Sequence, residues 1–537
     1  MTRGGFASRL VLWLALTVSC DTGGDVEPVA RDPEDSAAGP HSDGRVRDAG
    51  ASVRDASKDG AASVSKPSDA SVRAADTDAR STGSTNPDAG AAGETDAGNG
   101  ESETSAQALP PALRSAGVVA LFPAPAGTDL CADPPLRITF SAPPTLGSAG
   151  KLQVFDAAEP RTAVATVDLA SKTVSDQRGG VSFVMERPAY VEGNAAVFYL
   201  PSRALHAERR YFVHLDKGAL RGPAGGEPAI SDDQTWVFST GKGSTSGAPT
   251  RKVALDGTGE FCSLQGAVDA VGAGSSTIEL GRGTYHGIVY FKSKRDLTIR
   301  GVDRKATILA GVNNENMNGG TAKRALIGVD ASSNITFVNL TIHNRTPQGG
   351  SQAEALRMQS CDRCSVRDAD ILSLQDTLLW SGRVYAKNCY IAGNVDFIWG
   401  TGAAFFDQCE IKTLGRKGYN VQARNAAGGY GYVFVDSKLT HDPGITGNWL
   451  GRVDASVYPA SHVAYIDCEL GSHIDPVGWQ VTGAGGGSLR FWEYRSKSPS
   501  GAAVDTSRRL AASKQLTEAE AAMMRDPSVV LGGWSPE

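Results

Sequence analysis

A short internal repeat in the C-terminal half constrains the fold of this chain most strongly. A five-residue pattern closes on an aliphatic residue six times, at Ile342, Ile371, Ile391, Ile411, Leu439 and Leu470. These residues lie 29, 20, 20, 28 and 31 positions apart. A period of about 20 residues with one recurrent strand is typical of a parallel β-helix, in which longer spacings mark inserted loops. We therefore interpret each pattern as a short strand and predict that the aliphatic residues form a ladder through the interior.

The part before this repeat has a different pattern. Apolar and polar residues alternate in short runs such as Leu136–Phe140 and Arg210–Leu215, with turn residues between them. Such runs predict a small antiparallel β-sandwich over residues 111–243. With its strand Ile138-Thr139-Phe140-Ser141 and its closing segment Trp236–Thr240, this part resembles bacterial Ig-like modules. That resemblance implies a structural spacer.

The N-terminus has the composition of an export signal followed by a tether. Residues 1–20 place Arg3 and Arg9 before the apolar run Leu10–Leu16 and end at Cys20, which is the predicted lipidation site. Residues 21–110 lack Phe, Trp, Tyr, Ile and Met, so they cannot bury enough apolar surface to fold and are predicted to be a disordered linker. We expect an exported protein, either a cell-surface lipoprotein or a secreted protein.

Charge and cysteine content exclude several classes. The formal net charge is -6, which gives no indication of binding to nucleic acid, and any contact with a membrane would go through the lipid anchor. Cys361-x-x-Cys364 has no second CxxC or histidine cluster beside it, so it does not predict a metal site. We interpret the cysteines as small buried residues or one disulfide. Cys389 and Cys409 share a repeat position and are expected to stack on neighbouring coils.

Two acidic residues outside the interior ladder are candidates for chemistry. Asp376 follows one coil segment and Asp396 follows the next, and their separation of 20 residues equals one turn of the repeat. Strands on adjacent coils lie about 4.8 Å apart, so both carboxylates could face one substrate atom. Two carboxylates at close range push their pKa values apart, so that one ionises while the other keeps its proton. Covalent hydrolysis of an ester needs this combination.

Several ordered motifs give the second half, residues 248–537, a specific resemblance. They are Gly283–Tyr285, Gln352–Arg357, Gln375–Leu378, Val395–Gly400, Leu450–Arg452, His473–Trp479 and Phe491–Tyr494. In this order they resemble the pectin methylesterases, carbohydrate esterases that act on methylated homogalacturonan. The resemblance implies a right-handed parallel β-helix as the catalytic domain, so the expected fold class is all-β.

The resemblance also implies roles for individual residues. Asp396 would be the nucleophile that attacks the galacturonate methyl ester, and Asp376 would be the general acid and then the general base. Gln352 and Gln375 would donate hydrogen bonds to the developing oxyanion. Arg452 would pair with Asp396 and keep it ionised. The expected product is de-esterified pectate plus methanol, from a monomer that needs no metal or organic cofactor.

The predicted binding surface departs from the family pattern. Trp399, Trp479 and the neighbouring Trp380 are expected to provide the walls that stack on sugar rings. After Arg452 the family continues with proline and tryptophan, whereas this chain has Val453 and Asp454. A carboxylate there would repel an anionic polymer unless it makes a local hydrogen bond.

Two other functions compete with pectin ester hydrolysis. The chain could be a catalytically altered surface protein that only binds pectin, or an esterase acting on a related ester, and the altered residue Asp454 keeps this alternative open. A polygalacturonate lyase or hydrolase fits less well, because a lyase needs a cluster of acidic calcium ligands that the sequence lacks. The absence of a G-x-S-x-G motif argues against a serine esterase of the α/β-hydrolase type.

Overall fold

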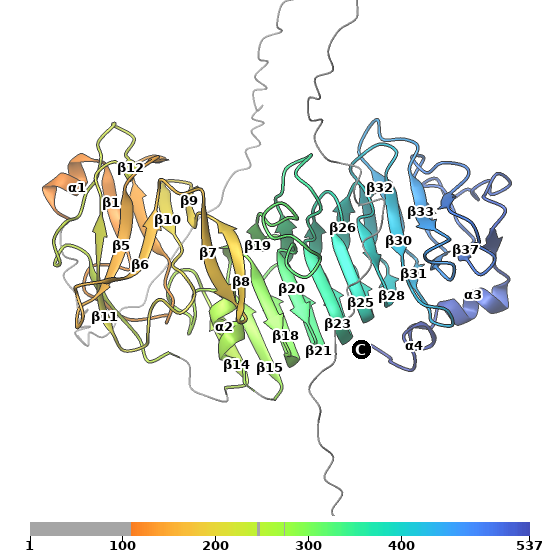
Figure 1. Cartoon of the computed structure of the whole chain (residues 1–537), viewed down its shortest axis with the longest axis horizontal. Coiled ribbons are helices and arrows are strands. Elements are labelled where there is room, and N and C mark those ends of the chain that lie inside the picture. Colours follow the sequence, from red (N-terminus) through yellow and green to blue (C-terminus); the bar gives the residue numbers. More distant parts are fainter. Residues whose placement is uncertain (1–108, 244–247, 273, 537) are drawn as a thin grey trace, which may run out of the picture. The chain divides into compact units, whose positions relative to one another are not determined.

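The computed structural model describes residues 109–243, 248–272 and 274–536 (Figure 1). The predicted signal over residues 1–20, with Cys20, lies outside the described residues, as does the predicted linker except for its last two positions. Within the described ranges no helix combines the length and the apolar character needed to span a membrane.

The first folded part consists of two main sheets around one hydrophobic core. One sheet has the order β1-β3-β10-β9, formed by Val118–Phe122, Leu136–Phe140, Ala195–Phe198 and Ala189–Glu192. The other has the order β2-β13-β11-β5-β6, formed by Gly127–Leu130, Val237–Thr240, Arg210–Leu215, Lys151–Asp156 and Ala163–Asp168. Smaller elements are α1 (Pro111–Ser115), the pair β4 (Thr145–Leu146) and β12 (Leu220–Arg221), and the hairpin β7 (Thr173–Arg178) and β8 (Val181–Glu186). Alternating apolar residues point into the shared core, as the sequence pattern predicted.

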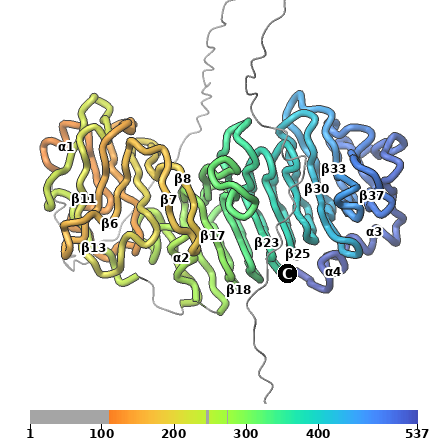
Figure 2. The backbone as a smooth tube through the Cα atoms, in the orientation of Figure 1, coloured from red at the N-terminus to blue at the C-terminus, as the bar shows by residue number. Residues whose placement is uncertain are grey.

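The second part is a parallel β-helix, and Figure 2 follows its backbone from coil to coil. A 17-stranded sheet contains β14 (Thr250–Val253), β15 (Ser276–Leu280), β17 (Val289–Lys292), β18 (Arg295–Gly301), β20 (Ile327–Asp330), β21 (Ser333–Val338), β23 (Leu356–Arg367), β25 (Leu378–Lys387), β27 (Ile398–Gly400), β28 (Ala403–Asp407), β30 (Tyr419–Ala423), β31 (Tyr432–Val435), β33 (Trp449–Asp454), β34 (His462–Ile466), β36 (Trp479–Thr482), β37 (Arg490–Tyr494) and β38 (Ser513–Gln515). An eight-stranded sheet contains β16 (Gly283–His286), β19 (Thr307–Gly311), β22 (Thr341–Asn344), β24 (Asp370–Leu372), β26 (Tyr390–Gly393), β29 (Glu410–Thr413), β32 (Lys438–His441) and β35 (Glu469–Leu470). The predicted fold class is confirmed.

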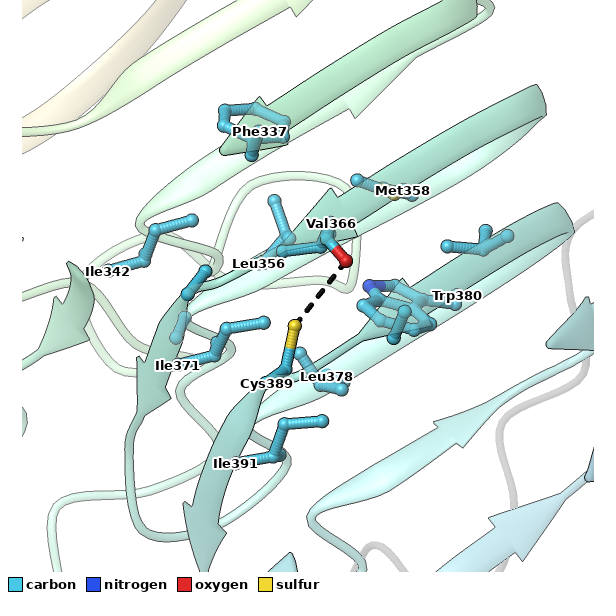
Figure 3. Close-up of a cluster of buried hydrophobic side chains, with 14 of the residues drawn as sticks. Phe337, Ile342, Leu356, Met358, Val366, Ile371, Leu378, Trp380, Cys389 and Ile391 are labelled. Atoms are coloured by element: carbon cyan, nitrogen blue, oxygen red, sulfur yellow. Dashed lines mark hydrogen bonds between the residues drawn. The ribbon is translucent and has the colours of Figure 1, made fainter. Parts of the chain in front are cut away.

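The aliphatic ladder exists, but the five-residue patterns are corners and not strands. The ladder positions are paired in register through the eight-stranded sheet, from Ile342 to Ile371 and onward to Leu470, and Figure 3 shows its first rungs beside Trp380. The second residue of every pattern has a left-handed backbone, with φ of 60°, 49°, 51°, 53°, 48° and 56° at Asn339, Asp368, Asn388, Gln408, Asp436 and Asp467. This residue turns the chain from one sheet into the other, so the prediction of a continuous strand was wrong.

The cysteines form two disulfides, one more than expected. Cys361 and Cys364 are bonded to each other within β23, and a second disulfide joins Cys131 of the first part to Cys262 of the β-helix. The remaining described cysteines are buried thiols, and Cys389 and Cys409 lie on adjacent coils as predicted. Burial raises the pKa of the Cys409 thiol, so it stays protonated.

Hydrogen bonds reinforce the junction that the second disulfide closes. Asp133 accepts a hydrogen bond of 2.6 Å from the backbone amide of Cys262 and another from the Ser263 hydroxyl, which caps α2 (Leu264–Ala270). Asp133 also lines a cavity of about 310 Å³. On the hairpin side, the Asn318 side chain pairs with both backbone groups of Val184, at 2.7 and 2.9 Å. The first part is therefore tied covalently and by hydrogen bonds to the loops of the β-helix.

Two short helices after the last coil cover part of the long sheet. They are α3 (Glu518–Met524), whose first turn is closed by a capping box between Thr517 and Glu520, and α4 (Pro527–Val530). Their buried residues pack on a hydrophobic cluster that includes Phe405 and Val433. This cluster lies outside the main interior ladder.

Candidate active site

The two candidate aspartates occupy equivalent corners of successive coils. Asp376 precedes β25 and Asp396 precedes β27, each by two residues, and the pairing of Leu378 with Ile398 places the aspartates in register. Both have left-handed backbones, with φ of 63° and 46°, and both are buried with 6% of their surface exposed. Aspartate is one of the few residues that adopt this conformation at low cost. The predicted juxtaposition across one coil is present in the structure.

Arg452 of β33 binds Asp396 through both carboxylate oxygens. The Nε atom donates hydrogen bonds of 2.9 and 3.0 Å to Oδ1 and Oδ2, and an Nη2 group also donates to Oδ2. The guanidinium lies over the ring of Tyr419, 4.7 Å from its centroid. A bidentate arginine stabilises the ionised carboxylate and fixes its orientation. This geometry suits a carboxylate that must act as a nucleophile.

The two predicted amide donors lie beside the aspartates, and both are half-buried. Gln375 directly precedes Asp376, and its carbonyl accepts a hydrogen bond from Ala353, the residue after Gln352. Gln375 also pairs with Val395 of the next coil. The two glutamines therefore come from adjacent coils, and Gln375 is next to Asp376 in the chain.

The three tryptophans predicted as sugar-binding walls have different environments. Trp399 is buried, with 7% of its surface exposed, but lies outside the interior core, with the guanidinium of Arg424 4.6 Å and that of Arg324 5.6 Å from its ring centroid. Trp380 and Trp479 are 1% exposed and belong to the interior core.

The prediction of a sugar-binding role for Trp380 and Trp479 is therefore wrong. The ring of Trp380 stacks on that of Phe406 with 5.4 Å between centroids, and the ring of Trp479 stacks on that of Phe491 with 4.5 Å between centroids. Each tryptophan ring therefore packs against another interior side chain. Strand alternation turns these residues inward, because side chains on a strand point to opposite faces in turn.

Asp454, at the altered position after Arg452, makes local hydrogen bonds. One carboxylate oxygen accepts from the Ser456 backbone amide at 2.9 Å and from the Ser456 hydroxyl at 2.5 Å. These hydrogen bonds lower the pKa of Asp454, so the carboxylate is ionised at neutral pH. The side chain caps its own turn and keeps its negative charge.

A buried charge cluster lies beside Asp376 and was not predicted from the sequence. Arg324, from the segment before β20, donates a hydrogen bond of 2.8 Å to Oδ2 of Asp376 and two hydrogen bonds of 2.9 and 3.0 Å to Glu354. Glu354 is fully buried. It stands two residues before Leu356, which pairs with Leu378, so Glu354 occupies the position of Asp376 one coil earlier. One signal for this cluster was present, because Glu354 is a charged residue inside the otherwise apolar run Ala353–Leu356.

An aromatic pair on the other side of Asp396 was also not predicted from the sequence. Tyr419 and Trp449 pair in register and stack with 5.1 Å between ring centroids, and both are half-buried. The pairing of Ile398 with Val421 puts Tyr419 in register with Asp396. Glu354, Asp376 and Asp396 are thus followed by Tyr419 and Trp449 in one row across five coils.

A groove of about 500 Å³ opens next to this row. Asn394 and Val395, the residues before Asp396, line it together with Gln348, Leu414–Arg416 and Pro443–Ile445. Its lining includes one basic side chain, that of Arg416.

A parallel β-helix with paired aspartates and an arginine on one of them can support the covalent hydrolysis of an ester. Residues 250–525 match the sequence model of the pectinesterase family. Pectinesterase 31 of Arabidopsis thaliana is 31% identical over 287 residues, which cover 50% of this chain and 88% of that protein. Pectinesterase 2 of Olea europaea is 32% identical over 285 residues, covering 50% and 75%. The solved pectin methylesterase from carrot aligns at 25% identity with a TM-score of 0.48, covering 54% and 95%.

The chain belongs to the pectinesterase family. It is therefore a carboxylic ester hydrolase, as the sequence motifs indicated.

Proposed function

We propose that this protein hydrolyses the methyl esters of galacturonate in pectin and releases methanol, with Asp396 as the nucleophile. The observation that carries the assignment is the bidentate contact of Arg452 with Asp396, in register with Asp376 one coil away. Membership of the pectinesterase family supports the choice of substrate.

The first half of the reaction forms an acyl-enzyme. A carboxylate oxygen of Asp396 adds to the ester carbonyl, and the resulting oxyanion accepts hydrogen bonds from Gln352 and Gln375. The carbon–oxygen bond to the methoxy group then breaks, and Asp376 gives its proton to the departing oxygen. Methanol leaves, and the galacturonate acyl group is held on Asp396 as an anhydride.

The second half returns the enzyme to its starting state. The ionised Asp376 takes a proton from a water molecule, which attacks the acyl carbon. The bond to Asp396 breaks, so that the galacturonate product leaves as a carboxylic acid, which loses its proton to the solvent, and Asp376 again carries its own proton. This cycle needs one aspartate that stays ionised and one that exchanges a proton.

The contacts of the two aspartates support that division of roles. Arg452 donates hydrogen bonds to both oxygens of Asp396, which favours the ionised form of this carboxylate. The arginine on Asp376 is shared with Glu354 and Glu315, so its charge is already offset by two other carboxylates. We therefore assign the exchangeable proton to Asp376 and the ionised carboxylate to Asp396.

Aromatic residues along the row would hold the sugar chain. We assign stacking roles to Trp399 and to the stacked pair of Tyr419 and Trp449, because sugar rings bind to aromatic faces that are not filled by the core. Arg416 in the adjoining groove offers a cation for a free uronate.

For the parts of the chain before the β-helix we propose an export and attachment role. The N-terminal signal, lipid attachment at Cys20 and the Ala/Asp-rich linker would display the enzyme at the cell surface, with the Ig-like part as a spacer. A monomer is sufficient for this function, because all the assigned site residues come from one chain.

Methanol release from a panel of methylated and acetylated pectins tests the function. We expect release from methylated pectin by the native protein, loss in Asp396→Ala, and severe reduction in Asp376→Ala. Full activity in a correctly folded Asp396→Ala variant would overturn the mechanism. Binding of pectin by the native protein without methanol release would instead favour a surface pectin-binding protein, the alternative suggested by the charge of Asp454.

A further inference from the structure

Arg324 connects Asp376 to a carboxylate that the proposed reaction does not use. Its guanidinium donates to Asp376 at 2.8 Å, to both oxygens of Glu354 at 2.9 and 3.0 Å, and to Glu315 at 3.2 Å. The side chains of Arg324 and Glu354 are 4% and 0% exposed, whereas that of Glu315 is 37% exposed. Charge–charge interactions are strong only where water is excluded, so the Arg324–Glu354 contact dominates this cluster.

A single buried arginine would work against an acid catalyst. A positive charge at hydrogen-bond distance typically lowers the pKa of a carboxyl group by 1–3 units, roughly, and would hold Asp376 ionised. Glu354 opposes this effect, because its full negative charge lies on the same guanidinium. Burial lowers the pKa of Arg324, but the attraction of Glu354 and Asp376 outweighs it, and the pKa of Arg324 is raised well above its usual value. Arg324 therefore keeps its charge at every working pH.

Other charged groups on this side of the row come from later coils. Asp396 stands in register with it and carries Arg452, and Arg424 lies over the ring of Trp399. These groups are the same in any variant of Arg324 or Glu354. A change in the titration of Asp376 in such a variant can thus be assigned to the altered pair.

We propose that Arg324 and Glu354 are positioning residues, a buried charge pair that orients Asp376 and sets the pH at which it gives up its proton. This inference rests on the proposed function. Arg324 fixes one oxygen of Asp376 by a direct hydrogen bond, and Glu354 fixes Arg324 and offsets its charge. In consequence, Asp376 is held in place like a salt-bridged carboxylate but remains protonated over a wider pH range than such a carboxylate would.

The pH profile of kcat/KM tests the pair. The profile should rise as Asp396 ionises and fall as Asp376 loses its proton. Glu354→Gln leaves the charge of Arg324 less offset, so we expect the falling limb to move to lower pH by about one unit, with the rising limb unchanged. Arg324→Met removes the cation, so the falling limb should move to higher pH. The double variant Arg324→Met with Glu354→Gln should return close to the native position.

Glu315→Gln is the matched control, because it removes a carboxylate from the same guanidinium at a solvent-exposed place. We expect its falling limb to move by less than a third of the shift in Glu354→Gln, since water screens the lost charge. Melting temperatures identify any variant that fails to fold. If Arg324→Met does not fold, Arg324→Lys replaces it, because lysine keeps a cation at this position. The falling limb of Arg324→Lys should move less than that expected for Arg324→Met.

Two failures can be told apart in this experiment. If the native protein releases no methanol at any pH, the proposed function is wrong. If the native protein is active and the variants lose rate while both limbs stay at the native pH, Arg324 and Glu354 only support the fold and this inference is overturned.

Discussion

The backbone amide of Asp376 donates a hydrogen bond of 3.1 Å to the carbonyl of Val395, the residue before Asp396. This contact ties together the corners of two successive coils at the point where each presents an aspartate. Both corners have left-handed backbones. Their side chains therefore do not follow the alternation between the two faces of a sheet that applies to residues within the strands. The spacing of the two carboxylates is therefore a property of the coil repeat and does not depend on mobile loops.

The two aspartates should differ in their response to the leaving group. An aryl ester of a galacturonate oligomer releases a good leaving group that needs no proton, so Asp376→Asn should still give one equivalent of aryl alcohol and then stop at the acyl-enzyme. Asp396→Asn should give no burst, because the nucleophile is lost. Stopped-flow absorbance measures both. A burst in Asp396→Asn would contradict the assigned roles.

Substitutions of Trp380 and Trp399 should separate stability from activity, because only Trp380 belongs to the interior core. Trp380→Ala leaves a cavity in the interior beside Phe406 and should lower the free energy of unfolding by about 3–5 kcal/mol. Trp399→Ala should change stability much less but lower kcat/KM on pectin about tenfold, which corresponds to about 1.4 kcal/mol of lost binding. Denaturant unfolding and methanol release provide the two measurements. Equal losses of stability in the two variants would contradict this division.

The charge of Asp454 should make the enzyme prefer highly methylated regions. Its hydrogen bonds with Ser456 lower the pKa of Asp454, so the carboxylate repels free uronates at neutral pH. Asp454→Asn keeps an acceptor for Ser456 and should raise kcat/KM several-fold on sparsely methylated pectin, with little change on fully methylated pectin. Added salt should shrink the difference, because it screens an exposed charge. No change on either substrate would show that Asp454 lies away from the polymer.

The disulfide between Cys131 and Cys262 should contribute to the stability of the whole catalytic part. The bridge closes a loop with a sequence separation of 131 residues, for which the chain-entropy model gives up to about 5 kcal/mol. Replacing both cysteines by alanine should therefore lower the melting temperature. The matched control is the Cys361→Ala, Cys364→Ala pair, whose disulfide spans only three residues and should matter less. A larger loss in the control would contradict the entropic argument.

Asp133 should make stability decrease between pH 4 and pH 7. Burial raises the pKa of Asp133 from 3.8 to about 6, although hydrogen bonds from Ser263 and Cys262 act in the opposite direction. A raised pKa means that the folded state binds the proton more tightly, so this stability is present below pH 3.8 and is lost as the pH rises through 6. The contribution is at most about 3 kcal/mol. Asp133→Asn should flatten the pH dependence of unfolding measured in urea, and an unchanged slope would contradict it.

The fold could be predicted because its main determinant is a spacing. Inward aliphatic residues recur at each coil, so Ile371, Ile391 and Ile411 indicated the ladder without any knowledge of the backbone. The corners were missed because hydrophobic pattern carries no information about φ. A signal was present, since five of the six left-handed positions are Asn or Asp, the residues that best tolerate this conformation.

The site was predictable to the extent that its residues lie in local motifs. Asp376, Asp396 and Arg452 could be found from their motifs, whereas Trp380 and Trp479 were misplaced because one position of register decides whether a ring faces the core or the solvent. Arg324 could not be found from the sequence. It reaches Asp376 across 52 residues, and only the folded coil brings the two together.

The left-handed corner has a consequence for how this enzyme can change in length. Each coil enters and leaves the corner in the same conformation, so a whole coil is a unit that can be inserted or removed without disturbing the conformation of its neighbours. Adding one coil beyond Trp449 would extend the groove by one strand spacing, about 4.8 Å, and leave the catalytic coils unaltered. The length of polymer that the enzyme covers can therefore change only in steps of one coil.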